Sequence, residues 1–323
     1  MGATALALRR LAASLLVLLL VSAVVYWGTA VLPGDALTAV LPMDILQTIS
    51  PEELARRRTE LGIDRPHLVQ FGEFLGRVVQ LDFGRTTVTR EDVLERIDHP
   101  LRNSLLLAGL TAIAAPLAAV ALAVASVLRP RGRLDAALTG GTLFAYALPE
   151  FVTGNLLIIL FAVLLPIAPA VILLPTTAAA VDLLGVIALP IATLILGGIA
   201  YQYRLLRAAL IEALDSDYCE RARLSGAPDW QVVLRHALPS ALVPMLSATA
   251  QFVSALISGG IVIEFIFGYP GIGQELVQAI STRDIPSVQA IALFGAAAVV
   301  LCNLAADLMI LALDPRVRRR SHA

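Results

Sequence analysis

Residues 11–32 read LAASLLVLLLVSAVVYWGTAVL, an apolar run without a single charged side chain. A bilayer core about 30 Å thick needs roughly 20 apolar helical residues, so this stretch predicts a membrane-spanning helix. The run is longer than the apolar core of a signal peptide, which has about 7 to 15 residues, and we therefore expect the helix to be retained. Arg9 and Arg10 precede it and mark its polar flank.

Five further runs of this kind follow, at about 101–128, 136–165, 183–206, 239–267 and 288–313. The chain is 58% hydrophobic and 15% charged, with a mean hydropathy of +0.81, whereas soluble domains are about half apolar and a quarter charged. The sequence therefore predicts an all-α polytopic membrane protein with six transmembrane helices. The stretch 166–181, PIAPAVILLPTTAAAV, is short and holds three prolines, which favours a loop or a partly immersed segment.

The distribution of arginines predicts the orientation. With six spans, nearly all arginines near the membrane fall on one side, and Arg283 alone occupies the short connections opposite. The positive-inside rule then places both termini in the cytoplasm. A seventh span at 166–181 would move many of those arginines outside, so we reject it. The arginines on the predicted inner side are Arg9, Arg10, Arg129, Arg131, Arg133, Arg204, Arg207, Arg221, Arg223, Arg235, Arg316, Arg318, Arg319 and Arg320.

Composition excludes several kinds of site. The net charge of −1 gives no global field that would point to nucleic acid. All basic residues are arginine, and without a lysine the chain cannot build a G-x-x-x-x-G-K-[ST] phosphate loop. If ATP drives this protein, another chain binds it. Cys219 and Cys302 are interpreted as packing residues, and no metal site is expected because the four histidines are scattered without ligand spacing.

The segment 33–100 is long enough to form a small external region between the first two spans. Its pieces SPEELARRRTELG (50–62) and REDVLERI (90–97) predict short amphipathic helices. Ser50 can cap the first, Glu52 and Glu53 suit its positive first turn, and Gly62 can end it. A docking surface is the preferred interpretation and a solvated spacer is the alternative. The predicted organisation is thus 1–32, 33–100, a permease core at 101–315 with a cytoplasmic loop at 212–239, and a tail at 316–323.

Residues 217–230, DYCERARLSGAPDW, interrupt the apolar sequence with a charged helical pattern. Asp215 or Ser216 can cap this helix, while Asp217 and Glu220 carry the charge favoured in a first turn. Gly226 can take the left-handed conformation that ends it. Charges lie all around the helix, leaving only a narrow stripe of Tyr218, Ala222 and Ser225. A groove in another protein is therefore a better host than a lipid surface.

These residues resemble a known signature. The spacing of Glu220, Ala222, Gly226, Leu238 and Pro239 is similar to the cytoplasmic loop of the membrane subunits of bacterial binding-protein-dependent ABC importers. Arg221 stands where that family often has Ala, and His236 where it often has Ile. The resemblance implies a type I importer permease fold and a coupling helix that sits in a groove of the ATPase subunit. The coupling residues that it implies are Asp217, Tyr218, Glu220, Arg221, Ala222, Arg223, Leu224, Ser225 and Gly226.

Other stretches resemble the dipeptide, oligopeptide and nickel branch of this family, specifically its first permease. The resemblance implies an inner-membrane subunit that carries di- or oligopeptides, with nickel chelates, haem or another small solute as alternatives. It implies a homologous second permease, two cytoplasmic ATPase domains that bind ATP and Mg, and an external substrate-binding protein. The stretches are LPGD (32–35), LGIDRP (61–66), DFGR (82–85), PEFVTGNLLI (149–158), FGYPGIGQELVQAISTRD (267–284) and NLAADLMILALDPRVR (303–318).

Polar side chains inside the predicted spans are candidates for a translocation pathway. Ser247, Gln251, Ser254 and Ser258 recur at helical spacing on one face of the fifth span, where tight helix packing is the alternative. Glu150 lies in the third span, and a charge in mid-bilayer costs roughly 2.5 to 3.5 kcal/mol, so it is expected to face a cavity or a partner. Neutralisation by a proton, or a hydrogen bond to a neighbouring helix, is the alternative. The remaining predicted pathway residues are Asn155 and Glu264.

The glycine-rich turn after the fifth span is predicted to flank an external gate. Pro270, Gly271 and Gly273 force a turn after Tyr269, and a short external helix can follow from Gln274. The gate assignment comes from the resemblance.

Two other classes of membrane protein were weighed. An ion-coupled secondary carrier is expected to show repeated halves and coupled ionisable residues, and no clear repeat is present. A channel or a purely structural protein would not need the charged cytoplasmic loop. The sequence therefore predicts a non-catalytic permease of an ATP-driven importer that binds no cofactor itself.

Overall fold

The computed structural model describes residues 3–30, 65–87 and 89–313, together with residues 50, 52, 53, 56 and 59. Within these ranges the regular structure is helical, and the one β-type contact is an isolated bridge between Arg85 and Asp92. The prediction of an all-α membrane protein is confirmed. The long helices are α1 (Ala3–Ala30), α6 (Val93–Val127), α7 (Arg133–Ala147), α10 (Ala188–Leu214), α13 (Leu238–Phe267) and α15 (Ile285–Leu313).

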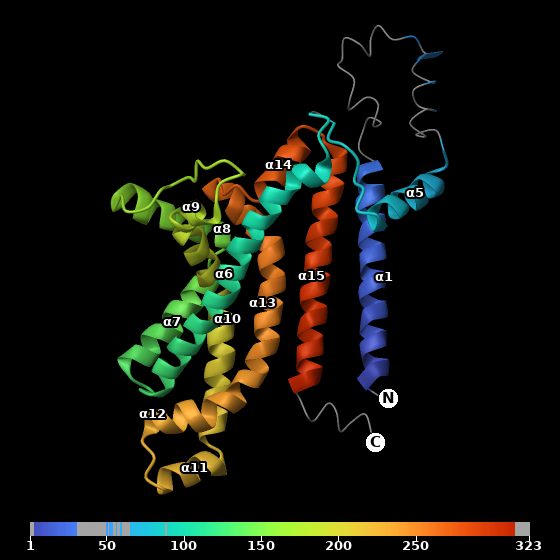
Figure 1. Ribbon diagram of the computed structural model, residues 1–323. Helices are drawn as coiled ribbons and strands as arrows, with labels where there is room; N and C mark the ends of the chain where they lie inside the picture. The colour runs from blue at the N-terminus through green and yellow to red at the C-terminus, as the bar shows by residue number, and fades with distance from the viewer. Residues whose placement is uncertain are drawn as a thin grey trace.

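Shorter elements connect the long helices or lie at their ends. Figure 1 shows α5 and α14 at one end of the molecule and α11 and α12 at the other. The first described residues of α1 and the last of α15 lie at the end that carries α11. The shorter elements are α5 (His67–Val79), α8 (Glu150–Ile158), η1 (Ile159–Leu164), α9 (Ala180–Leu184), α11 (Asp217–Leu224), α12 (Asp229–Gln231), η2 (Val232–Ala237) and α14 (Ile272–Ser281).

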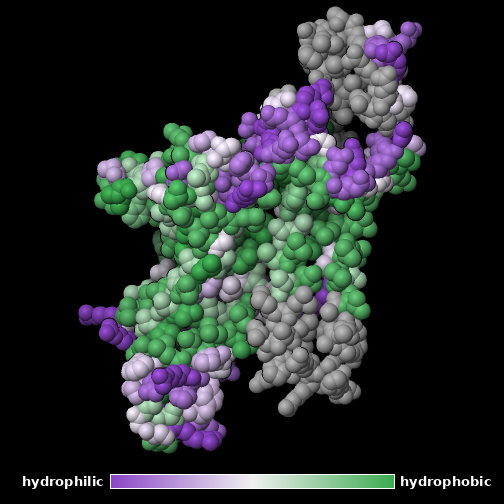
Figure 2. Space-filling view, viewed as in Figure 1, coloured by the Kyte–Doolittle hydropathy of each residue, from purple (hydrophilic) through white to green (hydrophobic). Residues whose placement is uncertain are grey.

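A broad apolar band runs across the molecule between two polar ends, as Figure 2 shows. Five helices in the described ranges are long and apolar enough to cross a membrane, and a bent pair raises this number to six. The bent pair joins α7 to α8 and η1 at an angle of 107°. The band and the helix lengths agree with a multi-pass membrane protein.

The third predicted span, 136–165, is broken in the middle, and the expectation of one continuous helix was wrong. The backbone leaves the helical region at Leu148 (ψ 132°), the residue before Pro149. A proline disfavours helical geometry in the residue that precedes it, so the Leu148–Pro149 pair ends α7 and starts α8 in a new direction. Glu150 is the first residue of α8, directly after the break.

The second and fourth spans also differ from their predicted limits. REDVLERI forms no separate helix, because α6 begins at Val93, where the Asp92 side chain accepts a hydrogen bond from Leu94 N–H (2.8 Å). Helix α10 continues to Leu214, beyond the predicted end at 206. The helix continues past Arg207 because Asp135 accepts two hydrogen bonds from its guanidinium inside the fold.

The predicted helix at 50–62 falls mostly outside the described residues, including Gly62. Its cap is nevertheless visible, since Glu53 N–H donates to Ser50 Oγ at 3.2 Å. The stretch 166–179 forms no spanning helix, as predicted. It instead packs on the C-terminal end of α13, where Ile172 N–H donates to Phe267 O (2.7 Å).

Helix α10 lies at the centre of the fold and packs on α6, α7, α8 and α13. Its two halves belong to two hydrophobic cores, one around Tyr203 and Leu206 and the other around Leu194. Gly198 allows α10 and α13 to approach closely, because a Cβ at this position would lie 1.9 Å from the Phe252 ring. Helix α1 packs beside α15, while much of its surface remains open to lipid.

Candidate functional site

The charged loop predicted from the sequence forms a short helix at one polar end of the molecule, α11. Ser216 occupies the N-cap position, but its side chain makes no cap; its hydroxyl donates to Ala213 O instead. Asp217 and Glu220 lie in the first turn, where the helix dipole favours negative charge. Gly226 has φ +87°, in the left-handed region that glycine adopts without strain, and it ends the segment as predicted.

Helix α11 is attached to the membrane helices by its small side chains. Cys219 is fully buried in the core that contains Tyr203, which confirms its packing role, and Ala222 packs against the same core. Tyr218 lies on the exposed side rather than on the attached stripe, and its hydroxyl hydrogen-bonds Ser240 Oγ (2.9 Å). Arg223 donates to Leu214 O (3.1 Å) and fixes the angle between α10 and α11.

The outward surface of α11 carries both signs of charge and one large apolar side chain. Asp217, Glu220, Arg221 and Ser225 are exposed, and Leu224 is 81% exposed. Figure 2 shows this end as a mixture of hydrophilic and hydrophobic side chains. A single exposed leucine is common on protein surfaces, but Tyr218 and Trp230 are exposed as well, so this end combines large apolar and aromatic side chains with charges, as protein interfaces do.

The glycine-rich turn after α13 is held tightly against α6. Tyr269 donates to Asn103 O (2.7 Å), and Asn103 Nδ2 donates to Pro270 O (2.8 Å). Burial and the nearby Glu264 carboxylate raise the pKa of Tyr269, so its hydroxyl stays protonated and remains a donor. The predicted gate residues are therefore a rigid, buried corner of this chain.

The carboxylate of Glu264 also holds this corner in place. It is 3% exposed and accepts a hydrogen bond from Gly273 N–H (2.7 Å). A Cβ at Gly271 would lie 2.5 Å from its carboxyl carbon, so only glycine fits there. The structure thus separates Glu264 from the other predicted pathway residues and gives it a structural environment.

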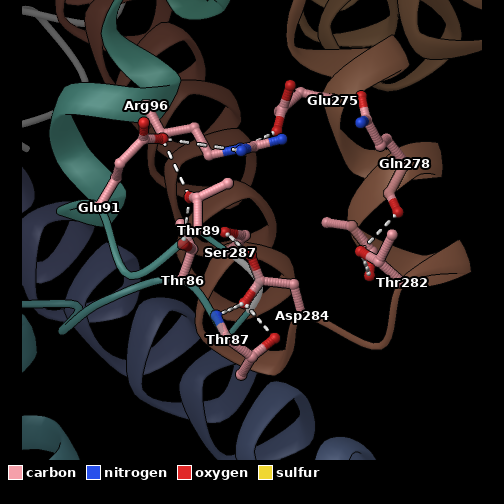
Figure 3. Close-up of polar contacts among 11 residues, drawn as sticks. Thr86, Thr87, Thr89, Glu91, Arg96, Glu275, Gln278, Thr282, Asp284 and Ser287 are labelled. Carbon is pink, nitrogen blue, oxygen red and sulfur yellow. Dashed lines mark hydrogen bonds and ion pairs between the residues drawn. The ribbon is translucent and has the colours of Figure 1, made fainter. Parts of the chain in front are cut away.

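A second polar network holds together the end of the molecule that carries α14, and no sequence signal predicted it. Asp284 is buried and accepts hydrogen bonds from Thr87 N–H (2.9 Å) and Ser287 Oγ (2.6 Å). Arg96 of α6 pairs with Glu275 of α14. Figure 3 shows these groups joining the segment before α6 to the turn between α14 and α15.

The polar side chains predicted on α13 lie on a surface that this chain leaves open. Ser247 and Gln251 are exposed, and Ser254 is half-buried with its hydroxyl bonded to Ala250 O (3.1 Å). The side chain of Ser258 lies outside the described residues. Asn155 is exposed on α8, where its amide donates to Phe151 O (2.8 Å).

Glu150 lies where α8 crosses the other two helices. A Cβ at Gly197 of α10 would lie 2.8 Å from its Oε1, and a Cβ at Gly259 of α13 would lie 3.1 Å from its Oε2. These two glycines make room for the carboxylate between α10 and α13. Among the described residues Glu150 has no hydrogen-bond or ion-pair partner, and it is half-buried.

An arginine on the same face of α10 is also left without an acidic partner in the described part of the chain. The Arg204 guanidinium lies 5.1 Å from the centroid of the Tyr146 ring, and both side chains are exposed. Arg204 follows Gly197 by seven residues, which is two helical turns and therefore the same face. The sequence analysis treated Arg204 only as an orientation signal.

A fully paired cluster forms around Arg207, one helical turn after Arg204 on α10. Arg207 donates to both carboxylate oxygens of Asp135, through Nε at 2.9 Å and Nη2 at 2.8 Å, and also contacts Ser126. Tyr203 Oη donates to Ser126 Oγ (3.1 Å). This cluster ties α6, α7 and α10 together just above α11. It was not predicted, although an acid and an arginine next to apolar runs were a usable signal.

The described residues contain no group of three or more potential metal ligands. The absence of a cofactor remains a prediction. What the geometry offers is a short charged helix, α11, at one end and an open face that holds Glu150 and Arg204.

Comparison with known proteins gives a consistent result. A family model described as binding-protein-dependent transport system inner membrane component matches residues 115–319. The model for the N-terminal part of such membrane components matches residues 4–92. Together the two models account for most of the chain.

Curated relatives match over nearly the whole length. A putative peptide transport system permease protein of Brucella abortus (strain 2308) is 35% identical over 316 residues, which is 98% of this chain and 99% of the relative. A probable peptide ABC transporter permease protein of Sinorhizobium fredii is 30% identical over 311 residues, 96% and 98% of the two chains. The oligopeptide transport system permease protein of Bacillus subtilis (strain 168) is 32% identical over 259 residues, 79% and 82%.

Proposed function

This chain belongs to the family of binding-protein-dependent transport system inner membrane components, and from that premise we propose that it forms half of the pathway of an ATP-driven importer of short peptides. Permeases of this family are non-catalytic, membrane-spanning subunits, and so is this chain. The peptide assignment is supported by the names of relatives that match over almost the whole chain.

The observation that carries the proposal is the exposed surface of α11. A helix of eight residues is not stable alone in water, yet α11 is held in place by the buried Cys219 while its charges and Leu224 point outward. We propose that two ATPase domains bind this surface and the corresponding helix of a second permease. ATP and Mg would belong to those partners, because this chain has no lysine for a phosphate loop.

The open face that includes Glu150, Gln251 and Arg204 is proposed to meet the second permease across a central pathway. Polar and charged groups are costly against lipid, so a wet pathway is the better environment for them. ATP binding would bring the ATPases together, pull on both docking helices and turn the pathway outward by rigid-body movement. An external binding protein would deliver the peptide at the end that carries α14.

The orientation follows from the arginines. We propose that α11 and both chain ends are cytoplasmic. Arg221 and Arg223 lie in α11 and Arg235 follows it, and the positive-inside rule favours the cytoplasm for such clusters. The described ends of α1 and α15 lie at the same end of the molecule, in agreement with this orientation.

The function is tested with the tagged chain purified in mild detergent together with its native partners. Mass spectrometry should identify ATPase subunits and a second permease. After reconstitution, uptake of radiolabelled trialanine should require ATP and the binding protein. Uptake that follows a proton gradient and ignores ATP would contradict the proposal and favour a secondary carrier.

The docking surface is tested in the same material by Leu224→Asp. A buried charge at the centre of an interface should uncouple ATP hydrolysis from uptake, while the chain still inserts into the membrane. Asp182→Asn, a change of an exposed acid on α9, is the control and should leave coupling unchanged. Normal coupling in Leu224→Asp would show that α11 is not the docking helix.

A further inference from the structure

We infer that the open face of α10 and α13 is a polarised binding site for a zwitterionic peptide, with Glu150 receiving the α-ammonium group and Arg204 the α-carboxylate. The inference rests on the proposed function and adds the orientation of the substrate in the pathway. Its basis is the position of Glu150 and Arg204 on one face of the membrane domain, about two helical turns apart. Neither side chain has an oppositely charged partner in the described part of the chain.

The position of Glu150 is built to hold a carboxylate. Gly197 and Gly259 each lie against one of its oxygens, and an alanine at either position would crowd the carboxylate. Both helices therefore have a glycine, without a side chain, at the point where the Glu150 carboxylate lies against them. Packing alone does not need a charged group there, since an apolar side chain could fill the same space without the cost of a charge in the membrane.

The local environment explains why the ligand should be a cation. The carboxylate lies against Gly197 and Gly259, which are inside α10 and α13, where backbone N–H groups bond within the helix. No arginine or hydrogen-bond donor of the described residues reaches Glu150. The charge is thus left to be balanced by something that enters from the open side.

Two exposed strips lead away from Glu150 toward the α11 end. On α10 the strip passes through Tyr201 and Arg204 and continues to Ala208. On α13 it passes through Ala255 and Gln251 to Ser247, at steps of four residues. Glu150 lies against Gly197 and Gly259, so both strips begin next to its carboxylate.

Arg204 adds a positive charge to this surface, two helical turns from Gly197. Its guanidinium is positioned by the Tyr146 ring, an arrangement that costs the arginine none of its N–H donors. A guanidinium with free donors is well suited to bind a carboxylate in a bidentate manner. Arg207, one turn further along, cannot serve, because Asp135 already occupies it.

The spacing matches a short peptide. Seven residues separate Gly197 from Arg204, which corresponds to about 10 Å along the helix axis. An extended peptide advances about 3.3 to 3.6 Å per residue, so about three residues span the two charges. The free peptide carries these same two charges at its ends at neutral pH. The side chains of Ser247 and Gln251 can then form hydrogen bonds with the peptide backbone.

The site is tested in the complete reconstituted transporter with chemically blocked peptides. Glu150→Gln should lower uptake of trialanine about tenfold or more, the effect of losing a charge-assisted hydrogen bond. Uptake of N-acetyl-trialanine, which has no ammonium group, should change less than twofold. The binding protein is the same in both preparations, so a changed preference belongs to the permease. Asp182→Asn, an exposed acid on α9 outside the face, is the control and should leave both rates unchanged.

The opposite end has the mirrored test. Arg204→Gln should lower uptake of trialanine but not of trialanine amide, which lacks the carboxylate. An equal loss for blocked and free peptides in either variant would overturn the inference and point to a contact with the second permease. Unchanged uptake of free trialanine in Glu150→Gln would overturn it as well.

A measurement that does not depend on uptake fixes the orientation. Tripeptides with a photoreactive side chain at the first or the last position are bound to the wild-type complex and irradiated. The first position should label α8 next to Glu150, and the last should label the neighbourhood of Arg204 and Tyr146. Identical or reversed labelling would overturn the inference. Absence of ATP-dependent uptake of any peptide by the wild type would instead refute the proposed function.

Discussion

Arg204 and Arg207 lie one turn apart on α10 and have opposite environments. Arg207 points into the fold, where Asp135 binds it through two hydrogen bonds and Ser126 adds a third contact. Arg204 points out and rests on the Tyr146 ring. The two residues are the same chemically and almost the same in depth, so the difference lies in whether the chain itself supplies a partner.

Their acidic counterparts repeat the contrast on the two halves of the broken span. Asp135 on α7 accepts hydrogen bonds from Arg207, Ser126 and the backbone of Arg131. Glu150 on α8 accepts none from the described residues. A charge that the fold satisfies contributes to stability, whereas a charge that the fold leaves open is available for a ligand. Four variants sharpen this comparison.

The largest effect is expected for Arg207→Leu. Removing the guanidinium leaves Asp135 as an uncompensated buried charge, which should lower the free energy of unfolding by about 3 kcal/mol. The measurement is reversible SDS unfolding of the chain in mixed micelles. The double variant with Asp135→Leu should recover most of the loss. If Arg207→Leu were as stable as the wild type, the ion pair between Arg207 and Asp135 would not contribute to stability.

The next effect is expected for Gly198→Ala, which tests the close packing that holds α10 beside α13. The added Cβ would overlap the Phe252 ring, and overpacking of this kind costs about 1 to 3 kcal/mol. Gly260→Ala is the matched control, since nothing lies within 4 Å of a Cβ there. The same unfolding assay compares them, and equal stabilities would contradict the close approach.

A smaller effect is expected for Gly226→Val at the end of α11. A β-branched residue at φ +87° costs about 1 to 2 kcal/mol, so the helix should end differently and lose its coupling to ATP hydrolysis while membrane insertion persists. Gly226→Asn is the control, because asparagine tolerates left-handed geometry. Peptide-stimulated ATPase activity distinguishes the two variants. Wild-type coupling in Gly226→Val would show that a glycine at position 226 is not required for coupling.

The smallest change in stability is expected for Arg204→Gln. An exposed cation–π contact contributes about 0.5 to 1 kcal/mol, so the free energy of unfolding should fall by no more than this amount. The contrast with Arg207→Leu is the informative quantity. A loss in Arg204→Gln as large as that of Arg207→Leu would show that both arginines are structural.

The sequence predicted much of this arrangement because its strongest signals are local. Apolar runs of about 20 residues place spanning helices without any knowledge of packing, and the left-handed glycine at 226 places the end of α11. The face with Ser247 and Gln251 followed from helical spacing alone. The break at Leu148–Pro149 was missed because the apolar composition of 136–165 continues across it, although Pro149 was a usable signal.

What the sequence did not predict depends on contacts between distant segments. Asp135 and Arg207 are 72 positions apart, and neither shows its partner by spacing. Glu264 has the same kind of position in the sequence as Glu150, an acid in an apolar run, but the turn at Gly273 folds back and takes its carboxylate. Whether an intramembrane acid is structural or open is therefore decided by tertiary structure.

The pair of Asp135 and Arg207 also has a consequence for biosynthesis. A chain made from its N-terminus presents Asp135 to the membrane before Arg207 has been translated, so α7 first arrives with an acid that lacks its strongest partner. Only the arrival of α10 neutralises that acid and makes the inner position of α7 favourable. Helix α7 is thus expected to stay at the edge of the bilayer until α10 joins it.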